Sequence, residues 1–593
     1  MQDLLLKRVT VAVWRFSTAA LAAAFLAACA ATGQLPPNGG TGPEHDKPAS
    51  EAAETEAASH ARVAESLLEL GNYEAALDEL FQAAELSDDT QYVFLAARLA
   101  GLVEDWPASI RVAQRWLEID PQADAAHQLD IIARVNLGQH DNATQALERW
   151  LDGHQPGAED PEWWRLGAAV LSKSQNQAAA VSVFDLLAAR RGGQAPAGEV
   201  LRTRSELLMS QHEIARALED AIQAAEDSGH HQKQVWAGDL LAESGQPERA
   251  LEFYSKAFEQ LDENDTGLGL KTASVLAGLD RYDEALQLLR SLPPNSLTLY
   301  ETGRYLTQMK ERDGAIGVWR EMNELPARQR DKNHLFLQAV LADLNGLDEE
   351  ALRGYEQVDD PGTRPQARLR QARLLGRLDR LEEGRTVLQA LREENPDNEP
   401  LLIDAWLVEA AMLKEGGHGQ KAVDLLSRPL AQNHDSVELL MARSTLAMDI
   451  GNVDLAEQDL RRIIQMDSTS AVALNNLGYI LADMTDRHQE AYRLIKRAYE
   501  LEPNEAYILD SMGWALHKLG RNDEAAGFLQ RVFDEARDDD GFNFAEAGAH
   551  YIAVLDELGR HAEADRLTEK MLAEYPRDAY LLGILEELGR LPE

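Results

Sequence analysis

Few side chains of this sequence stand in an arrangement that could carry out a reaction. Residues 267–272 (Gly-Leu-Gly-Leu-Lys-Thr) are similar to a phosphate-binding loop, but a leucine precedes the lysine where that loop needs a glycine, and no strand comes before it. His212 and Glu213 lack the second histidine, one helical turn on, that would complete a zinc-binding face. His230 and His231 are adjacent and point to different sides of a helix. With no Gly-x-Ser-x-Gly nucleophile motif either, we expect a protein without catalysis, metal or cofactor.

The single cysteine, Cys29, ends an apolar N-terminal segment. Three basic residues precede a run of 13 apolar or small residues, 16–28, which is shorter than the roughly 20 that a spanning helix needs and is typical of a secretory signal peptide. The sequence Leu-Ala-Ala-Cys resembles a bacterial lipobox, in which the thiol is acylated before cleavage. We therefore expect residues 1–28 to be a lipoprotein signal peptide and Cys29 to carry the lipid. The alternative is an ordinary secretory signal with an incidental cysteine.

The segment that follows, residues 29–56, contains several prolines and glycines and shows no hydrophobic period, which predicts a flexible tether. About 25 such residues reach roughly 25–30 Å, enough to hold a folded body away from the lipid surface. Ala30 stands after the cysteine in place of aspartate. By resemblance to sorted lipoproteins, this predicts a lipid anchor in the outer membrane, on its periplasmic face.

The chain is strongly acidic, with a formal net charge of −43. Removal of residues 1–28 takes away three basic side chains and one acidic one, and leaves −45. The charge therefore predicts that nucleic acid and anionic lipid surfaces are not partners of this protein. The acidity is explained most simply by solvated helix surfaces, and the alternative is that it attracts basic partners.

Residues 57–578 repeat a pattern of small and large side chains with a period near 34 residues. Small residues allow the two helices of a hairpin to approach, and large ones fill the space between hairpins. The clearest copies carry Leu477, Gly478, Leu481, Ala491, Ile495, Ala498 and Pro503, and then Met512, Gly513, Leu516, Gly520, Ala525 and Leu529. This matches the tetratricopeptide pattern and predicts an all-α superhelical solenoid of about fifteen helical hairpins, with a capping helix and the C-terminus in residues 579–593. In one earlier copy, Trp163 is expected in the core and Trp164 at the surface.

The first helix of each tetratricopeptide hairpin lines the concave face of the array. With the Leu-Gly pair at positions seven and eight, the family's positions two, five, nine, twelve and thirteen turn inward. In two copies these positions hold aromatic, carboxyl and amide side chains, which would suit a groove for a peptide or protein. The residues are Asn475, Tyr479, Asp483, Tyr507, Asp510, Trp514 and His517. The alternative is that Trp514 and Tyr479 seal the joint between adjacent hairpins.

One basic stripe interrupts the acidic sequence. Its members fall at helical spacing, and all would face inward if Leu375 and Gly376 are the Leu-Gly pair of their copy. The stripe consists of Arg370, Arg373, Arg377 and Arg380. It predicts a site for an acidic partner or a chain carboxylate, and the alternative is pairing with acidic residues of neighbouring hairpins.

The sequence between residues 473 and 521 is more specific than a general repeat. It contains Ala-Leu-Asn-Asn-Leu-Gly-Tyr-Ile-Leu-Ala-Asp from residue 473, Asp-Arg at 486, Glu-Ala at 490, Ile-Leu-Asp-Ser-Met-Gly-Trp from 508 and Leu-Gly-Arg from 519. It resembles the C-terminal repeats of LbcA-type outer-membrane lipoproteins, which bind the periplasmic carboxyl-terminal processing protease. In that family the solenoid anchors and activates the serine protease and presents peptidoglycan cross-link hydrolases to it. The resemblance implies a non-catalytic adaptor with these partners.

A second function from another class stays open. Similar lipoprotein solenoids brace the outer-membrane pore of exopolysaccharide secretion machines, so a structural subunit of such a machine is the alternative.

Overall fold

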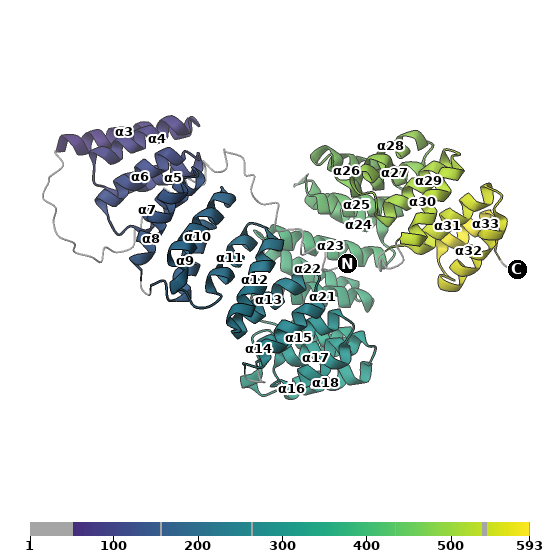
Figure 1. Ribbon diagram of the computed structural model, residues 1–593. Coiled ribbons are helices and arrows are strands. Elements are labelled where there is room, and N and C mark those ends of the chain that lie inside the picture. Colours follow the sequence, from purple (N-terminus) through teal and green to yellow (C-terminus); the bar gives the residue numbers. More distant parts are fainter. Residues whose placement is uncertain (1–50, 155–156, 262–264, 433–434, 536–541, 592–593) are drawn as a thin grey trace. The chain divides into compact units, whose positions relative to one another are not determined.

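The computed structural model describes residues 51–591, apart from 155–156, 262–264, 433–434 and 536–541. These residues form 31 α-helices and two short 3-10 helices, and no strand occurs among them (Figure 1). The predicted all-α class is confirmed. The signal peptide, Cys29 and the greater part of the predicted tether lie outside the described residues.

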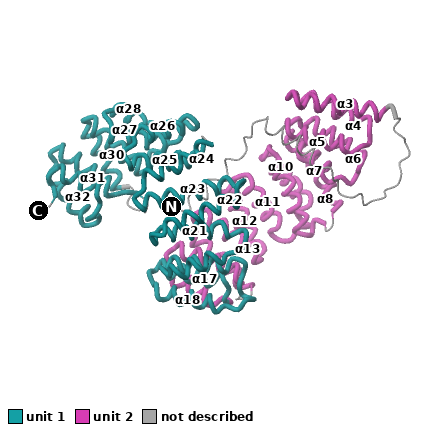
Figure 2. The backbone as a smooth tube through the Cα atoms, turned by 180° about the vertical axis from the view of Figure 1, so that it is seen from behind, with its two compact units in different colours: residues 1, 294–593 teal, residues 2–293 magenta. Residues whose placement is uncertain are grey.

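The chain divides between Pro293 and Pro294 into two compact units (Figure 2). The helices of the N-terminal unit are α3 (Glu51–Glu69), α4 (Tyr73–Leu86), α5 (Thr90–Leu102), α6 (Trp106–Ile119), α7 (Asp124–Asn136), α8 (His140–Asp152), α9 (Pro161–Leu171), α10 (Gln177–Arg191), α11 (Glu199–Ser210), α12 (Ile214–Ser228), α13 (His231–Glu243), α14 (Pro247–Phe258), α15 (Thr266–Gly278) and α16 (Tyr282–Ser291), with the 3-10 helix η2 (Gly192–Gln194).

The helices of the C-terminal unit are α17 (Ser296–Gln308), α18 (Arg312–Glu324), α19 (His334–Leu344), α20 (Asp348–Gln357), α21 (Arg364–Arg377), α22 (Leu381–Glu394), α23 (Glu399–Glu415), α24 (Gly419–Leu430), α25 (Val437–Asp449), α26 (Val453–Met466), α27 (Ala471–Met484), α28 (His488–Leu501), α29 (Ala506–Lys518), α30 (Asn522–Glu535), α31 (Phe544–Glu557), α32 (His561–Glu574) and α33 (Ala579–Glu587), with the 3-10 helix η3 (Ala327–Gln329).

Consecutive helices pair into fifteen hairpins, from α3 with α4 to α31 with α32, and α33 follows as a single final helix that packs on α31. We call the first helix of each hairpin helix A and the second helix B. The predicted number of hairpins and the terminal helix agree with this arrangement. The first helix of the described residues, α3, begins at Glu51, six residues before the predicted start, because 51–56 consist mainly of glutamate and alanine, which favour helix.

A residue in the left-handed conformation ends helix A in most hairpins. At Gly520, with φ of +73°, the amide donates to His517 O at 2.8 Å, and the next amide, of Arg521, donates to Leu516 O at 2.9 Å. This pair of bonds satisfies the last carbonyls of the helix and reverses the chain into helix B. Glycine holds the turn where it is available, but the same turn is held by Glu104, His212, Asp280, Lys310 and Asp379.

Small residues allow the helices of one hairpin to touch, as the repeat pattern predicts. A Cβ added at Gly513 would lie 2.5 Å from Leu529 Cγ, and one added at Gly478 would lie 2.5 Å from Ile495 Cγ1. Both distances are too short for a real side chain, so these positions require glycine for packing and not for backbone freedom.

The prediction for Trp164 was wrong. Trp163 is buried as expected, but the Trp164 side chain is also fully buried, and its Nε1 donates to Ala158 O at 2.8 Å. Its ring contacts Phe184 of α10 at 6.0 Å between centroids. Two neighbouring helical residues can both be buried here because α9 is covered by the helices on two sides, a condition that the spacing of one helix does not reveal.

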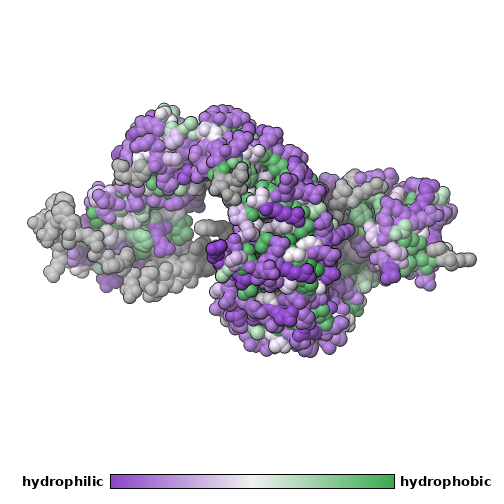
Figure 3. Space-filling view, turned by 90° about the horizontal axis from the view of Figure 1, so that it is seen from below, coloured by the Kyte–Doolittle hydropathy of each residue, from purple (hydrophilic) through white to green (hydrophobic). Residues whose placement is uncertain are grey.

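The surface of the described residues is largely hydrophilic on the face drawn in Figure 3, in keeping with a chain of which 27% is charged. Among these residues, none of the helices combines the length and apolar character that a membrane span requires.

Candidate functional site

The first helices of the hairpins together form one face of the array, which we call the helix A face. At the end of the C-terminal unit, the side chains of this face pack against one another. Every residue of α29 from Ile508 to Leu516 is buried, and so is every residue of α31 from Ala547 to Leu555. Tyr479 of α27 donates its hydroxyl hydrogen to the carboxylate of Glu546 on α31, which is 67 residues further along the chain and two hairpins away. This end of the array therefore offers a packed core where the sequence predicted a groove.

The core contains a chain of polar groups with His550 of α31 at its centre. His550 Nδ1 lies 2.9 Å from Asp510 Oδ1, and Nε2 lies 2.9 Å from the Tyr580 hydroxyl of α33. Trp514 stacks on the His550 ring at 4.1 Å, and its Nε1 donates to Asp483 Oδ1 at 2.9 Å. Burial raises the pKa of the Tyr580 hydroxyl, which keeps it neutral as a hydrogen-bonding group. Four helices are thus joined through one buried network.

The predicted inner-face residues fall into two groups. Asn475, Asp510 and Trp514 are buried, with 3%, 6% and 3% of their surface exposed. Asp510 and Trp514 contact neighbouring hairpins, as a joint between hairpins requires. The half-buried members keep some surface for a partner, which stays a prediction. They are Tyr479, Asp483, Tyr507 and His517.

Two of the half-buried residues are held by side chains close to them in the sequence. The Tyr507 hydroxyl donates to Glu502 Oε2 at 3.2 Å. The His517 ring stacks on Trp514 at 5.1 Å, and its Nδ1 lies 2.8 Å from Asn522 Oδ1. Burial lowers the pKa of His517, so its imidazole favours the neutral form.

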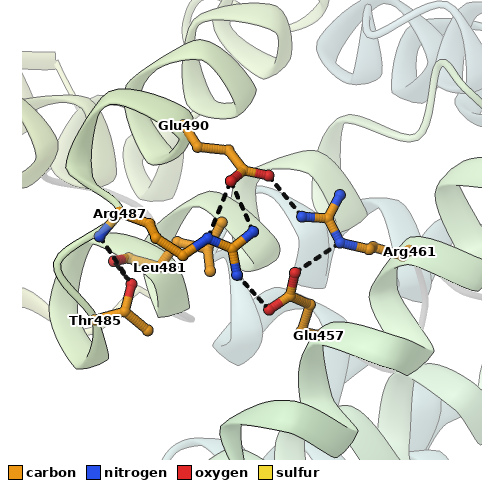
Figure 4. Close-up of polar contacts among 6 residues, drawn as sticks. All are labelled: Glu457, Arg461, Leu481, Thr485, Arg487 and Glu490. Atoms are coloured by element: carbon orange, nitrogen blue, oxygen red, sulfur yellow. Dashed lines mark hydrogen bonds and ion pairs between the residues drawn. The ribbon is translucent and has the colours of Figure 1, made fainter.

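Part of the distinctive motif at 473–521 builds a ring of four charges between adjacent hairpins (Figure 4). Arg487, which precedes α28, donates to Glu457 of α26 at 2.7 Å and to Glu490 of α28 at 2.7 and 3.0 Å. Arg461 of α26 closes the ring with bonds to Glu457 at 2.7 Å and to Glu490 at 2.6 Å. The guanidinium groups lower the pKa of both carboxyls. The ring ties α26 to α28, so these motif residues have a structural role.

The basic stripe on α21 does not form one surface. The left-handed residue Asp379 ends this helix A, and a Cβ added at Gly384 would lie 3.0 Å from Ala372 O. In the hairpin that contains Gly513, the left-handed residue Gly520 comes seven positions after that small residue. Counting seven positions back from Asp379 gives Ala372 as the equivalent small residue of α21. The assumed pair of Leu375 and Gly376 was therefore wrong by one helical turn.

This register separates the four arginines. Arg380 immediately precedes α22 and makes two bonds to Glu383, at 2.7 and 2.8 Å. Arg377 pairs with Asp343 of the preceding hairpin at 2.5 Å, as the alternative interpretation stated. Arg370 lies beside Tyr355 of α20, and Arg373 is exposed. A partner-binding role remains a prediction for the exposed Arg373 above all.

The contact between Arg380 and Glu383 has equivalents at the start of helix B in other hairpins. Each such arginine stands three residues before a glutamate and donates two hydrogen bonds to it. The glutamate lies in the first turn of the helix, where its negative charge complements the positive end of the helix dipole. The pairs are Arg281 with Glu284, Arg380 with Glu383, Arg487 with Glu490, Arg521 with Glu524 and Arg560 with Glu563.

An open cavity of about 510 Å³ lies on the helix A face of the N-terminal unit, between α9, α11, α13 and α15. We call it the N-terminal groove. Apolar side chains and charged side chains of both signs share its lining. The main lining residues are Arg165, Arg202, Glu206, Val235, Trp236, Asp239, Leu268 and Lys271.

One ion pair between helices and one within α11 order this groove. Lys271 Nζ lies 2.5 Å from Asp239 Oδ2, and Arg202 donates to Glu206 at 2.9 Å. The Trp236 indole donates to Ser205 Oγ at 3.0 Å, which fixes the ring against α11. A rigid aromatic side chain beside charged side chains is typical of protein-binding surfaces.

Sequence reasoning missed the groove because it followed the Leu-Gly pairs, which α11 and α13 lack. The left-handed residues Gly245 and Asp280 are the signal that would have found it. Counting back from Gly245 places Asp239 on the helix A face.

The motifs set aside at the outset have ordinary structural positions. Residues 267–272 lie within α15, where Lys271 lines the groove. His212 is a left-handed turn residue, and His230 precedes α13 and caps it. Across the described ranges, no group of three histidine, cysteine or acidic residues is placed to hold a metal ion.

Comparison with known proteins agrees with the hairpins. The tetratricopeptide repeat family model matches residues 366–398, which cover α21 and α22. The TPR repeat-containing protein PA4667 of Pseudomonas aeruginosa is 36% identical over 188 residues, which are 32% of this chain and 31% of the relative. The chain thus matches about a third of that relative's length.

Two solved structures illustrate the resemblance in fold. A tetratricopeptide repeat protein from Parabacteroides merdae, at 16% identity and a TM-score of 0.35, covers 43% of this chain and 97% of its own. A chain of the APC/C hetero-tetramer Cut9-Hcn1, at 14% identity and a TM-score of 0.32, covers 90% of this chain and 97% of its own. Such low scores carry no argument about partners. The matched repeat and the fifteen helical hairpins of the described residues are consistent with a superhelix of tetratricopeptide repeats.

Proposed function

We propose that this protein is a lipid-anchored scaffold on the periplasmic face of the outer membrane that binds other proteins. In its specific form, the proposal is an adaptor that holds and activates a carboxyl-terminal processing serine protease and presents cross-link hydrolases to it. The lipobox at Cys29 supports the anchor, and the resemblance at 473–521 supports the partners. Both come from the sequence, and the relative's repeats agree with a binding role.

The N-terminal groove is the observation that carries the binding role. The apolar lining of the groove includes Trp236, Val235 and Leu268. Its charged side chains form ion pairs, and these side chains can change partners without the unfolding of a helix. An extended protein segment could bury apolar side chains on this floor and satisfy its polar groups at the rim. The C-terminal helix A face is filled by its own side chains, so we assign client binding to the N-terminal groove.

The test is affinity purification of the tagged protein from its own envelope, followed by mass spectrometry. A double variant, Arg202→Glu with Lys271→Glu, reverses two groove charges, and Arg216→Glu on α12 is the matched control because its side chain is 49% exposed and outside the groove lining. We expect the unaltered chain and the control to recover the protease with hydrolases, and the double variant to lose hydrolases.

If the unaltered chain recovers no protease, and deletion of the gene leaves hydrolase levels unchanged, the adaptor proposal is wrong. Recovery of a polysaccharide-export β-barrel would favour the structural subunit instead. The anchor is tested separately with Cys29→Ala, which should move the protein from the membrane fraction to the soluble periplasm and abolish labelling by a fatty-acid analogue.

A further inference from the structure

A second cavity of the N-terminal unit, of about 540 Å³, lies between α7 and α8 and is closed on one side by the residues that join α6 to α7. It shares no lining residue with the N-terminal groove. We call it the α7–α8 cavity. Its polar lining is dominated by Asp124, Asp130, His127 and His154, beside the indole of Trp150.

Asp130 is a buried acid with an unused acceptor. The residue is 8% exposed and lines the α7–α8 cavity. Its Oδ2 accepts from Arg134 Nε at 2.8 Å, one turn along the same helix. Its Oδ1 is buried and accepts no hydrogen bond from any residue that the structure describes. A buried carboxylate oxygen without a donor is destabilising, so this atom is suited to a donor supplied from outside.

The other lining groups favour a cation at the same place. The Asp124 carboxylate accepts from Trp150 Nε1 at 3.1 Å and lies 3.5 Å from His154 Nε2. This bond fixes the Trp150 indole, which is 4% exposed, against the cavity. Indole rings attract ammonium and guanidinium groups through the negative charge of their faces. The lining of the cavity therefore includes two carboxylates from α7 and an aromatic ring from α8.

Other ligand classes fit less well. An anion would meet two carboxylates, and a purely apolar group would leave Asp130 Oδ1 without a donor. Arg149, the one arginine of the lining, is exposed and is bonded through Nε to Gln145 O of its own helix at 3.2 Å. His127 is likewise engaged, with Nε2 3.0 Å from Pro121 O.

We infer that the α7–α8 cavity binds a basic side chain, a lysine ammonium or an arginine guanidinium, of a partner protein. Asp130 Oδ1 accepts the hydrogen bond, Asp124 supplies the second negative charge and Trp150 supplies the ring face. The net charge of −43 raises the local concentration of basic partners around such a site. The inference goes beyond the proposed function and does not depend on which protein the scaffold recruits.

The test measures binding of two short peptides to the full chain by saturation-transfer NMR. One is acetyl-Gly-Lys-Gly-amide, and the other carries norleucine, which has the same number of side-chain carbons and no charge. We expect the lysine peptide to bind, the norleucine peptide to show no binding, and the signal to fall with added salt. Equal binding of both peptides, or of neither, would overturn the inference.

Three variants locate the site. Asp130→Asn removes the charge and keeps the shape, and Ala146→Leu fills the cavity while it leaves both carboxylates in place. Asp78→Asn is the matched control, because Asp78 is an exposed acid of α4 in the same unit. We expect about tenfold or greater loss of lysine-peptide affinity in the first two variants and none in the control. Unchanged binding by folded Ala146→Leu contradicts the assignment, even if Asp130→Asn does not fold.

Discussion

Replacement of Trp514 by alanine tests whether the C-terminal helix A face is a core or a binding surface. The side chain is 3% exposed, stacks on His550 at 4.1 Å and donates to Asp483 at 2.9 Å. Loss of a buried tryptophan costs about 3–5 kcal/mol, and the unpaired Asp483 adds about 1 kcal/mol. A loss of about 4–6 kcal/mol is comparable to the whole stability of a small domain, so we expect the last hairpins to open.

Hydrogen exchange with mass spectrometry measures this effect locally, through peptides from α27, α29 and α31. These peptides should lose protection in Trp514→Ala, while those from the N-terminal unit should not change. Leu501→Ala is the control, because Leu501 is 44% exposed on α28 and its loss should change stability by about 0.5 kcal/mol at most. If Trp514→Ala keeps full protection and loses only a binding partner, Trp514 is a surface contact and the core assignment is refuted.

Three further predictions concern the repeats. Gly513→Ala should destabilise α29 and α30 by about 1–3 kcal/mol in urea unfolding, because its Cβ would lie 2.5 Å from the facing leucine, whereas Gly527→Ala, with open space around it, should stabilise by about 0.5–1 kcal/mol. Arg487→Gln should reduce the acid dependence of stability. The pKa of Glu490 is lowered by its arginines, so its contribution is present above the ordinary value of 4.5 and is lost as the pH falls through the lowered value, and the variant should show a shallower loss in that window. Lys310→Gly should raise the melting temperature, since φ of +63° costs a side-chain-bearing residue about 1 kcal/mol. An unchanged melting temperature would contradict that strain.

The hairpin array was predictable because its determinants are local. A small residue on each helix and a left-handed residue at the turn recur every 30 to 40 residues, as Gly478 and Gly513 illustrate, and these features depend on neighbours close in sequence. The same reasoning failed where the small residue was ambiguous. Gly376 and Ala372 are both small, and only the position of Asp379 at the turn showed which of them faces helix B.

The sequence by itself determined the helical class, the number of hairpins and the absence of a recognisable catalytic motif. Only the tertiary structure decided which helix A faces are open. Tyr479 and Glu546 are 67 residues apart in the sequence and form a hydrogen bond, because small rotations between successive hairpins add up along the array. The sequence pattern of a single hairpin does not reveal this total rotation. The same accumulated rotation fills the C-terminal face with its own aromatic side chains, while in the N-terminal unit a groove remains open between α9 and α15.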